Sequence, residues 1–172
     1  QAYLQHDTLA QATRYIVNEW FGQYGLVVVN QDDAQLKQLF APIAHAELFE
    51  AKSYNLVQET NKQLSGFGYV NQAYARPVNL FYLTDDFRER IVRNNLGNGF
   101  DVLNTQLHFS DTQIENELKQ HPERFSPNVI LRPVYQQLVL PSVAYIGGGG
   151  ELAYWLQLQS VFELYGVNYP ML

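Results

Sequence analysis

Residues 143–155 read VAYIGGGGELAYW, and this stretch decides the fold. The apolar run 143–146 predicts a strand, the glycines 147–150 a loop, and the largely apolar residues from 152 to about 165 a buried helix. In α/β proteins, a strand that turns through glycines into a helix brings backbone N–H groups up to an anionic ligand. Glycine suits such a loop because it tolerates positive φ and lets a ligand approach the backbone closely.

The glycine run by itself leaves two interpretations open. It lacks the G-x-G-x-x-G pattern of dinucleotide-binding loops and the lysine of a Walker loop. Four glycines are also typical of a plain loop that leads into a helix or ends one. The residues alone therefore indicate either a ligand-binding loop or a connection without function.

The remaining chain alternates helical and extended patterns, which predicts an α/β protein. Helices are expected over 8–21, 35–40 and 42–64, with Thr8 and Gln11 forming a capping box and Pro42 separating the second helix from the third. Further helices are expected after Ser110, where Gln113 completes another capping box, and over 128–140, where Pro133 interrupts the pattern. Strands are expected at these residues: 26–29, buried; 78–83 and 87–94, as a hairpin; 101–107, as an edge strand.

Composition narrows the class of protein. The 172 residues include 47% hydrophobic residues and carry a net charge of −6, which argues for a folded domain and against a nucleic-acid partner. There is no cysteine, so disulfides and thiolate sites are excluded within this sequence. No apolar run approaches the length of a membrane span, and the four histidines lack metal-ligand spacing, so we expect neither a membrane segment nor a metal site.

The candidate site residues lie in the last third of the chain. Glu151, at the start of the predicted helix, would hold an ammonium group or accept a proton, or else only stabilise the helix dipole. Arg132 would clamp a carboxylate through its guanidinium fork, or else pair with a nearby acid. Asn128 and Gln136 flank Arg132 and would hold ligand or cap backbone, and Tyr154 and Trp155 would contact ligand or belong to the core.

Several blocks resemble the BshC family, the cysteine-adding ligases of bacillithiol biosynthesis. The strongest block contains SPNVILRP at 126–133, Gln136, LP at 140–141 and AYIGGGGELAYW at 144–155. Weaker matches lie at YGLV (24–27), LK (36–37) and RPVNLFY (76–82). One departure is Gly149, where the family has proline, so this loop has more conformational freedom to lose on ordering.

The resemblance implies part of a Rossmann-like core with an inserted connecting segment that contains the β-hairpin. We expect one α/β fragment of a longer protein over 1–172, with residues from 1 to about 108 including the insertion and 109–172 returning to the core. The implied activity is amide formation between cysteine and glucosaminyl malate, with Glu151 as the catalytic residue. Asn128, Arg132, Gln136, Gly147, Gly148, Gly149, Gly150, Tyr154 and Trp155 are the expected substrate-binding residues.

The resemblance also implies a cytoplasmic, homodimeric parent, with cysteine, glucosaminyl malate and the rest of the parent chain as partners and no nucleic acid or membrane. The energy source is open: ATP or another nucleotide follows from the chemistry of amide formation, because no nucleotide motif is present. The alternative from a different class is a non-catalytic structural or interaction module. A sugar-binding glycosyltransferase-like domain is a third option, but it should carry a basic phosphate-binding pair that this sequence lacks.

Overall fold

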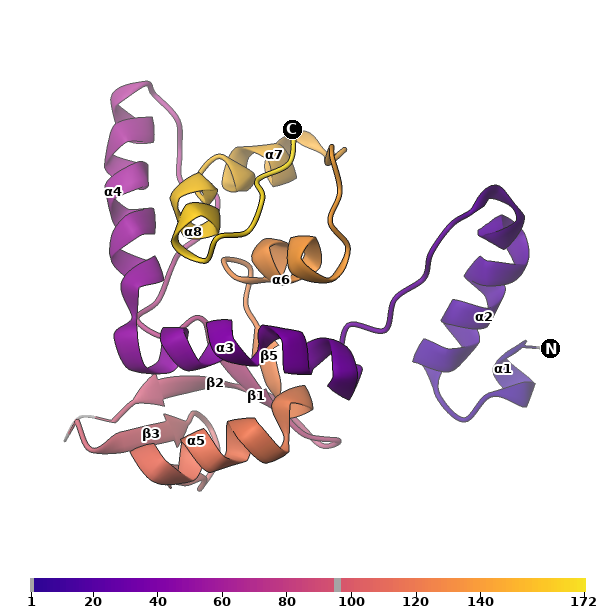
Figure 1. Cartoon of the computed structure of the whole chain (residues 1–172), viewed down its shortest axis with the longest axis horizontal. Helices are drawn as coiled ribbons and strands as arrows, with labels where there is room; N and C mark the ends of the chain where they lie inside the picture. The colour runs from indigo at the N-terminus through magenta and orange to yellow at the C-terminus, as the bar shows by residue number, and fades with distance from the viewer. Residues whose placement is uncertain (1, 95–96) are drawn as a thin grey trace. The chain divides into compact units, whose positions relative to one another are not determined.

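The computed structural model describes residues 2–94 and 97–172, and the chain divides into two compact units, Gln1–Asp33 and Ala34–Leu172 (Figure 1). The sequence analysis expected a single fragment with a division near residue 108. That position is the first residue of a strand inside the second unit, and the division stays a prediction. Within the described residues, no helix is both long and apolar enough to cross a membrane.

The first unit is helical. Helix α1 spans Ala2–Gln5 and α2 spans Leu9–Phe21, followed by a 3-10 turn, η1, at Gly22–Tyr24. One half of the predicted capping box is confirmed, because Thr8 accepts a hydrogen bond from the Gln11 backbone amide at 3.2 Å; the Gln11 side chain accepts the amide of Asp7 instead of that of Thr8. The strand predicted over 26–29 is wrong, because these residues are irregular and Val27 is 67% exposed. An apolar run forms a buried strand only where neighbouring strands pair with it and cover it.

The second unit begins with two helices, α3 (Ala34–Glu50) and α4 (Lys52–Gly66). The predicted break at Pro42 is wrong, since Pro42 lies inside α3. The face of α3 that carries Phe40, Ala44 and Leu48 is buried, and this packing holds the helix together across the proline. The break comes instead at Ala51, which adopts φ 50° in the left-handed region and turns the chain into α4.

A five-stranded antiparallel sheet follows, with the order β4-β3-β2-β1-β5. Its strands are β1 (Leu80–Leu83), β2 (Arg88–Arg93), β3 (Gly99–Val102), β4 (His108–Ser110) and β5 (Phe125–Pro127). The predicted hairpin is confirmed, because β1 pairs with β2 in the register Tyr82–Glu89. The single edge strand predicted over 101–107 is instead the end of β3 and a turn before β4. The sequence analysis missed β5, whose three residues are too few to show a period.

Two helices flank β5 along the chain. Helix α5 (Asp111–Gln120) starts at the predicted Ser110–Gln113 capping box, in which both reciprocal hydrogen bonds are present. A 3-10 turn, η2 (Pro122–Arg124), leads into β5, and α6 (Arg132–Val139) follows with proline in its first turn. The helix predicted from 128 therefore begins at Arg132, and residues 128–131 form a turn. Proline suits the first turn because the amide that it lacks has no partner there.

The stretch from 143 to the end of the chain differs most from expectation. Residues 143–146 form no strand: Ala144 makes one parallel bridge with Met171, and Ile146 is 98% exposed. The long buried helix is instead two short ones, α7 (Gly149–Trp155) and α8 (Gln159–Leu164). This single bridge joins the segment before α7 to the segment after α8, and it runs in the parallel direction that helical crossovers allow.

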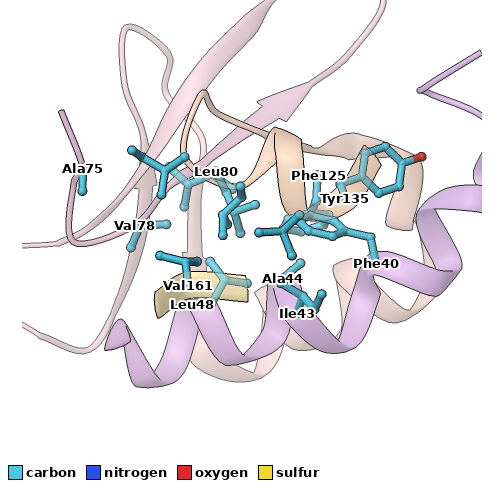
Figure 2. Close-up of a cluster of buried hydrophobic side chains, with 14 of the residues drawn as sticks. Phe40, Ile43, Ala44, Leu48, Ala75, Val78, Leu80, Phe125, Tyr135 and Val161 are labelled. Atoms are coloured by element: carbon cyan, nitrogen blue, oxygen red, sulfur yellow. The ribbon is translucent and has the colours of Figure 1, made fainter. Parts of the chain in front are cut away.

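One core serves the second unit. Side chains from α3, the sheet, α6 and α8 gather in it, including Phe40, Leu80, Phe125, Tyr135 and Val161 (Figure 2). The core extends to α7 through Trp155, which is fully buried. This shared core holds α6 and α7, the two helices that carry the predicted site, in one packed body.

Candidate functional site

The structure brings Arg132 together with two of its predicted neighbours. Its guanidinium donates through Nη1 to Gln136 Oε1 at 2.8 Å and through Nη2 to the Tyr154 hydroxyl at 2.5 Å. Gln136 is one turn further along α6, whereas Tyr154 belongs to α7. These two hydrogen bonds orient the guanidinium at the junction of the two helices, and Arg132 is half-buried there.

Asn128 determines where α6 begins. Its side-chain Oδ1 accepts the backbone amides of Ile130 at 2.9 Å and Leu131 at 3.4 Å, and its backbone carbonyl accepts the amide of Arg132 at 2.8 Å. Asparagine favours such turns because its side chain bonds its own backbone two residues on. Asn128 thus takes the backbone-capping role that the sequence left open, and a contact with ligand stays a prediction.

Glu151 is exposed at the third position of α7. Its Oε2 accepts the amide of Gly148, the residue that caps the helix, over a long 3.4 Å. A carboxylate accepts up to about four hydrogen bonds, so this long bond and a hydrogen bond from the Tyr145 hydroxyl leave acceptor capacity for a ligand. The electrostatic role at the helix start and the ligand role expected from the sequence are compatible in this position.

The four glycines of the loop are not equivalent. None of them has positive φ, so the loop does not use the tolerance of glycine for positive φ. At Gly147 an added Cβ would lie 2.7 Å from Tyr145 Cε1 and 3.2 Å from Glu151 Cβ, whereas close approach of a ligand to the loop stays a prediction. At Gly148, Gly149 and Gly150 an added Cβ would meet no atom within 4 Å. Only Gly147 is required, by the packing of the loop against Tyr145 and Glu151.

Tyr145 is a site residue that the sequence analysis missed. Burial raises the pKa of its hydroxyl, hydrogen bonding to the Glu151 carboxylate and the negative charge there raise it further, and Arg132 opposes the shift. Tyr145 therefore connects the acidic and the basic candidate. Its presence in the AYIGG block, directly before the loop, was the available signal, but the predicted strand assigned this residue to a sheet.

Trp155 belongs to the core. It is fully buried and stacks on Tyr145 with ring centroids 4.1 Å apart and an angle of 17° between the planes. Its backbone carbonyl accepts the Tyr169 hydroxyl at 2.8 Å, and its Nε1 has no hydrogen-bond partner among the residues that the structure describes. The indole thus holds the Tyr145 ring in place by stacking on it from the core side. Ligand contact by Trp155 stays a prediction.

The site combines one cation and one anion around tyrosine hydroxyl groups. Arg132 presents N–H donors and Glu151 presents acceptors, with Tyr145 and Tyr154 beside them. Such a pair is suited to a ligand that carries both a carboxylate and an amine. Across residues 2–94 and 97–172, no group of three or more His, Cys, Asp or Glu side chains is placed to hold a metal ion.

Comparison with known proteins identifies relatives over the whole chain. The family model described as "Bacillithiol biosynthesis BshC, N-terminal Rossmann-like domain" matches residues 1–172. A protein of Christiangramia forsetii named "Putative cysteine ligase BshC" is 52% identical over 172 residues, which are 100% of this chain and 32% of that protein. Proteins with the same name from Flavobacterium johnsoniae and Salinibacter ruber are 50% and 37% identical, over 99% of this chain and 31% of their own length.

The chain therefore spans about a third of the length of these relatives. The family description also explains the parallel bridge between Ala144 and Met171, because Rossmann-like domains are built from parallel strands joined by helical crossovers. With the match covering every residue, this chain belongs to the BshC family as its N-terminal Rossmann-like domain.

Proposed function

We propose that this domain is part of a ligase that joins cysteine to glucosaminyl malate through an amide bond. The observation that carries the proposal is the meeting of Arg132 and Glu151 around Tyr145, next to the glycine loop. The name of the relatives, putative cysteine ligase BshC, supports a ligase that acts on cysteine. A cytoplasmic location and a homodimeric parent, both expected from the sequence, stay predictions.

Arg132 is the proposed carboxylate clamp. A guanidinium carries five N–H donors, and the hydrogen bonds to Gln136 and Tyr154 use two of them while fixing the plane of the group. Glucosaminyl malate has two carboxylates, and a fork held in one plane binds a carboxylate through two parallel hydrogen bonds. Holding the malate end in this way would orient the rest of the substrate.

Glu151 is the proposed partner of the substrate amine. Its exposed carboxylate can accept hydrogen bonds from an ammonium group, and the backbone at 147–150 lies beside it to face the polar part of the ligand. The amine must lose a proton as its nitrogen bonds to the carboxyl carbon of cysteine, and one carboxyl oxygen of cysteine must leave together with the group that activates it. Glu151 would receive the proton. Tyr145 would keep the carboxylate oriented for this step.

The test is product formation by the full-length protein. Incubation with cysteine, glucosaminyl malate and a panel of nucleotides should yield bacillithiol, detected by mass spectrometry, and name the energy source. Arg132→Lys, which keeps the charge but loses the fork, should weaken binding of glucosaminyl malate about 10-fold or more. A well-folded protein that forms no product under any condition would contradict the proposal.

A second candidate is an interaction module without catalysis. The segment after α4 favours it, because large apolar side chains lie exposed there: Phe67 at 81%, Val70 at 76% and Tyr74 at 66%. Such a patch is typical of a surface that another part of a protein covers. If this is the main role, the isolated chain should self-associate in light scattering while the full-length protein does not, and product formation should be absent.

A further inference from the structure

A buried carboxylate with no role in the proposed reaction lies in the core of the second unit. Glu47, on α3, is 0% exposed. It accepts hydrogen bonds from the Ser53 hydroxyl at 2.7 and 2.8 Å, the Tyr165 hydroxyl at 3.0 Å, and the backbone and side-chain amides of Asn79 at 3.0 and 2.7 Å. These donors come from three segments of the chain, and Glu47 on α3 joins them at one point.

Asn79 links Glu47 to Asn128 by hydrogen bonds. Its Nδ2 donates to Glu47, while its Oδ1 accepts the amide of Arg76 at 2.8 Å and the side-chain amide of Asn128, also at 2.8 Å. Asn79 is itself 0% exposed, and its backbone carbonyl accepts the Asn128 amide at 3.0 Å. Two bonds therefore hold Asn128 to Asn79, one through side chains and one through backbone.

Asn128 is the last member of this chain of hydrogen bonds before α6. Its side-chain oxygen accepts the amides of Ile130 and Leu131 in the turn just before α6, and its carbonyl accepts the amide of Arg132, the first residue of α6. The connection from the buried carboxylate to the backbone of Arg132 is thus continuous: Glu47, Asn79, Asn128, Arg132. A displacement of about 1 Å at a clamp is enough to cost an enzyme about 100-fold, so the position of this turn matters.

We propose that Asn79 and Asn128 are positioning residues, which hold the first turn of α6 so that the Arg132 guanidinium meets Tyr154 and a ligand carboxylate together. The inference rests on the proposed function of Arg132 as a clamp. It adds that the position of Arg132 is fixed by hydrogen bonds that run from Glu47 in the core through Asn79 and Asn128, none of which contacts the ligand. Buried, fully paired networks of this kind rigidify the groups attached to them.

Asn128→Asp cuts one link of the chain and spares the others. The aspartate keeps the oxygen that caps Ile130 and Leu131 but loses the amide that donates to Asn79. In the full-length protein, calorimetric titration with glucosaminyl malate should show binding weakened about 5- to 20-fold. Asn128→Ser, which keeps a side-chain oxygen and adds no charge, is the variant to use if Asn128→Asp does not fold.

A double-mutant cycle with Arg132→Lys separates positioning from general destabilisation. If Asn128 acts through Arg132, Asn128→Asp should weaken binding little further once Arg132 is lysine. Tyr82→Phe is the control, because it removes a buried hydroxyl bonded to Glu117 and Arg124, away from α6, and should leave binding unchanged.

The outcomes distinguish the two proposals. Binding unaffected by Arg132→Lys would overturn the clamp itself and, with it, the inference. Binding weakened by Arg132→Lys but not by either Asn128 variant would overturn the inference alone. So would effects of the two substitutions that simply add, since Asn128 would then act independently of Arg132.

Discussion

Two glutamates in the second unit show how the same side chain serves opposite purposes. Glu47 is fully buried and accepts hydrogen bonds from Ser53, Asn79 and Tyr165. Glu151 is exposed and accepts one long backbone bond from Gly148. A saturated carboxylate stabilises the fold and has nothing left to offer a ligand, whereas one with spare acceptor capacity can bind. Burial and pairing, rather than residue type, separate the structural acid from the candidate catalytic one.

The largest effect is expected from Glu47→Ala. The substitution removes the acceptor of the Ser53 hydroxyl, the Asn79 backbone amide and the Tyr165 hydroxyl, and each buried group left unpaired costs about 1–3 kcal/mol. Urea unfolding followed by circular dichroism should show a loss of about 3 kcal/mol or more. Glu151→Ala is the matched control and should cost about 0.3–1 kcal/mol, as for an acid near a helix start. Equal losses would remove the distinction between the two acids.

Glu151→Gln tests the other half of the comparison. The amide keeps the shape of the side chain but loses its charge, and a hydrogen bond to a charged group is worth about 1.5–3 kcal/mol. Turnover of glucosaminyl malate by the full-length protein should therefore fall about 10- to 100-fold, while the free energy of unfolding falls by no more than about 0.3–1 kcal/mol. A variant that folds and turns over normally would show that Glu151 only supports its helix.

Gly147→Ala tests how closely the glycine loop packs against Tyr145 and Glu151. The new methyl group would lie 2.7 Å from the Tyr145 ring, which is held in place by stacking on Trp155. Overpacking of this kind costs about 1–3 kcal/mol in thermal or urea unfolding. Gly150→Ala is the control, since its Cβ meets no atom within 4 Å and alanine favours a helix, so stability should rise by about 0.5–1 kcal/mol. The same loss at both positions would mean that the loop is not packed as described.

At alkaline pH, the free energy of unfolding should depend more on Tyr165, which contacts the buried Glu47, than on Tyr145, which lies beside the exposed Glu151. Burial, followed by the charge of Glu47, raises the pKa of Tyr165 strongly above its ordinary value of 10.0. A raised pKa in the folded state means that the stability is complete below about pH 10 and is lost as the pH rises further. The free energy of unfolding should fall above that pH, and less steeply in Tyr165→Phe. Tyr145→Phe, beside the exposed Glu151, should change the slope less; the reverse order would contradict the contrast in burial.

The smallest effect is a gain. Gly149 is the first residue of α7, and Gly148 before it has φ −70° and ψ 162°, the extended geometry that a residue before proline prefers. Proline is favoured at this helix position, so Gly149→Pro should raise the free energy of unfolding by about 0.4–1 kcal/mol with turnover retained. A loss of stability would show that the backbone at Gly148 and Gly149 does not have the geometry described above.

Local signals predicted the parts of the fold that depend on local physics. The caps at Thr8 and Ser110 and the hairpin of β1 and β2 were predicted because each needs only a few neighbouring residues. The strand over 143–146 failed because an apolar run is buried only if other segments cover it. The break at Pro42 failed because the buried face of α3 outweighed a local preference.

The sequence predicted which residues belong to the candidate site better than it predicted which hydrogen bonds those residues make. Arg132, Gln136 and Tyr154 were named from the sequence and do meet, whereas Tyr145, which joins Glu151 to Arg132, was not named. Nothing in the pattern around Glu47 indicated a buried network, because an acid on a helix looks the same in sequence whether it faces solvent or the core. Burial of a single polar residue is a property of the packed domain.

The sequence by itself determined the α/β class, the hairpin, the helix caps and the family, because these depend on short patterns and on similarity along the whole chain. Only the tertiary structure decided which polar groups meet. Asn79 reaches Glu47 across 32 residues, and Arg132 reaches Tyr154 across 22. The choice of a hydrogen-bond partner at such separations follows from how helices and strands pack around one core, and no local spacing encodes it. The division between the acid that holds the fold and the acid offered to a ligand is therefore a product of packing.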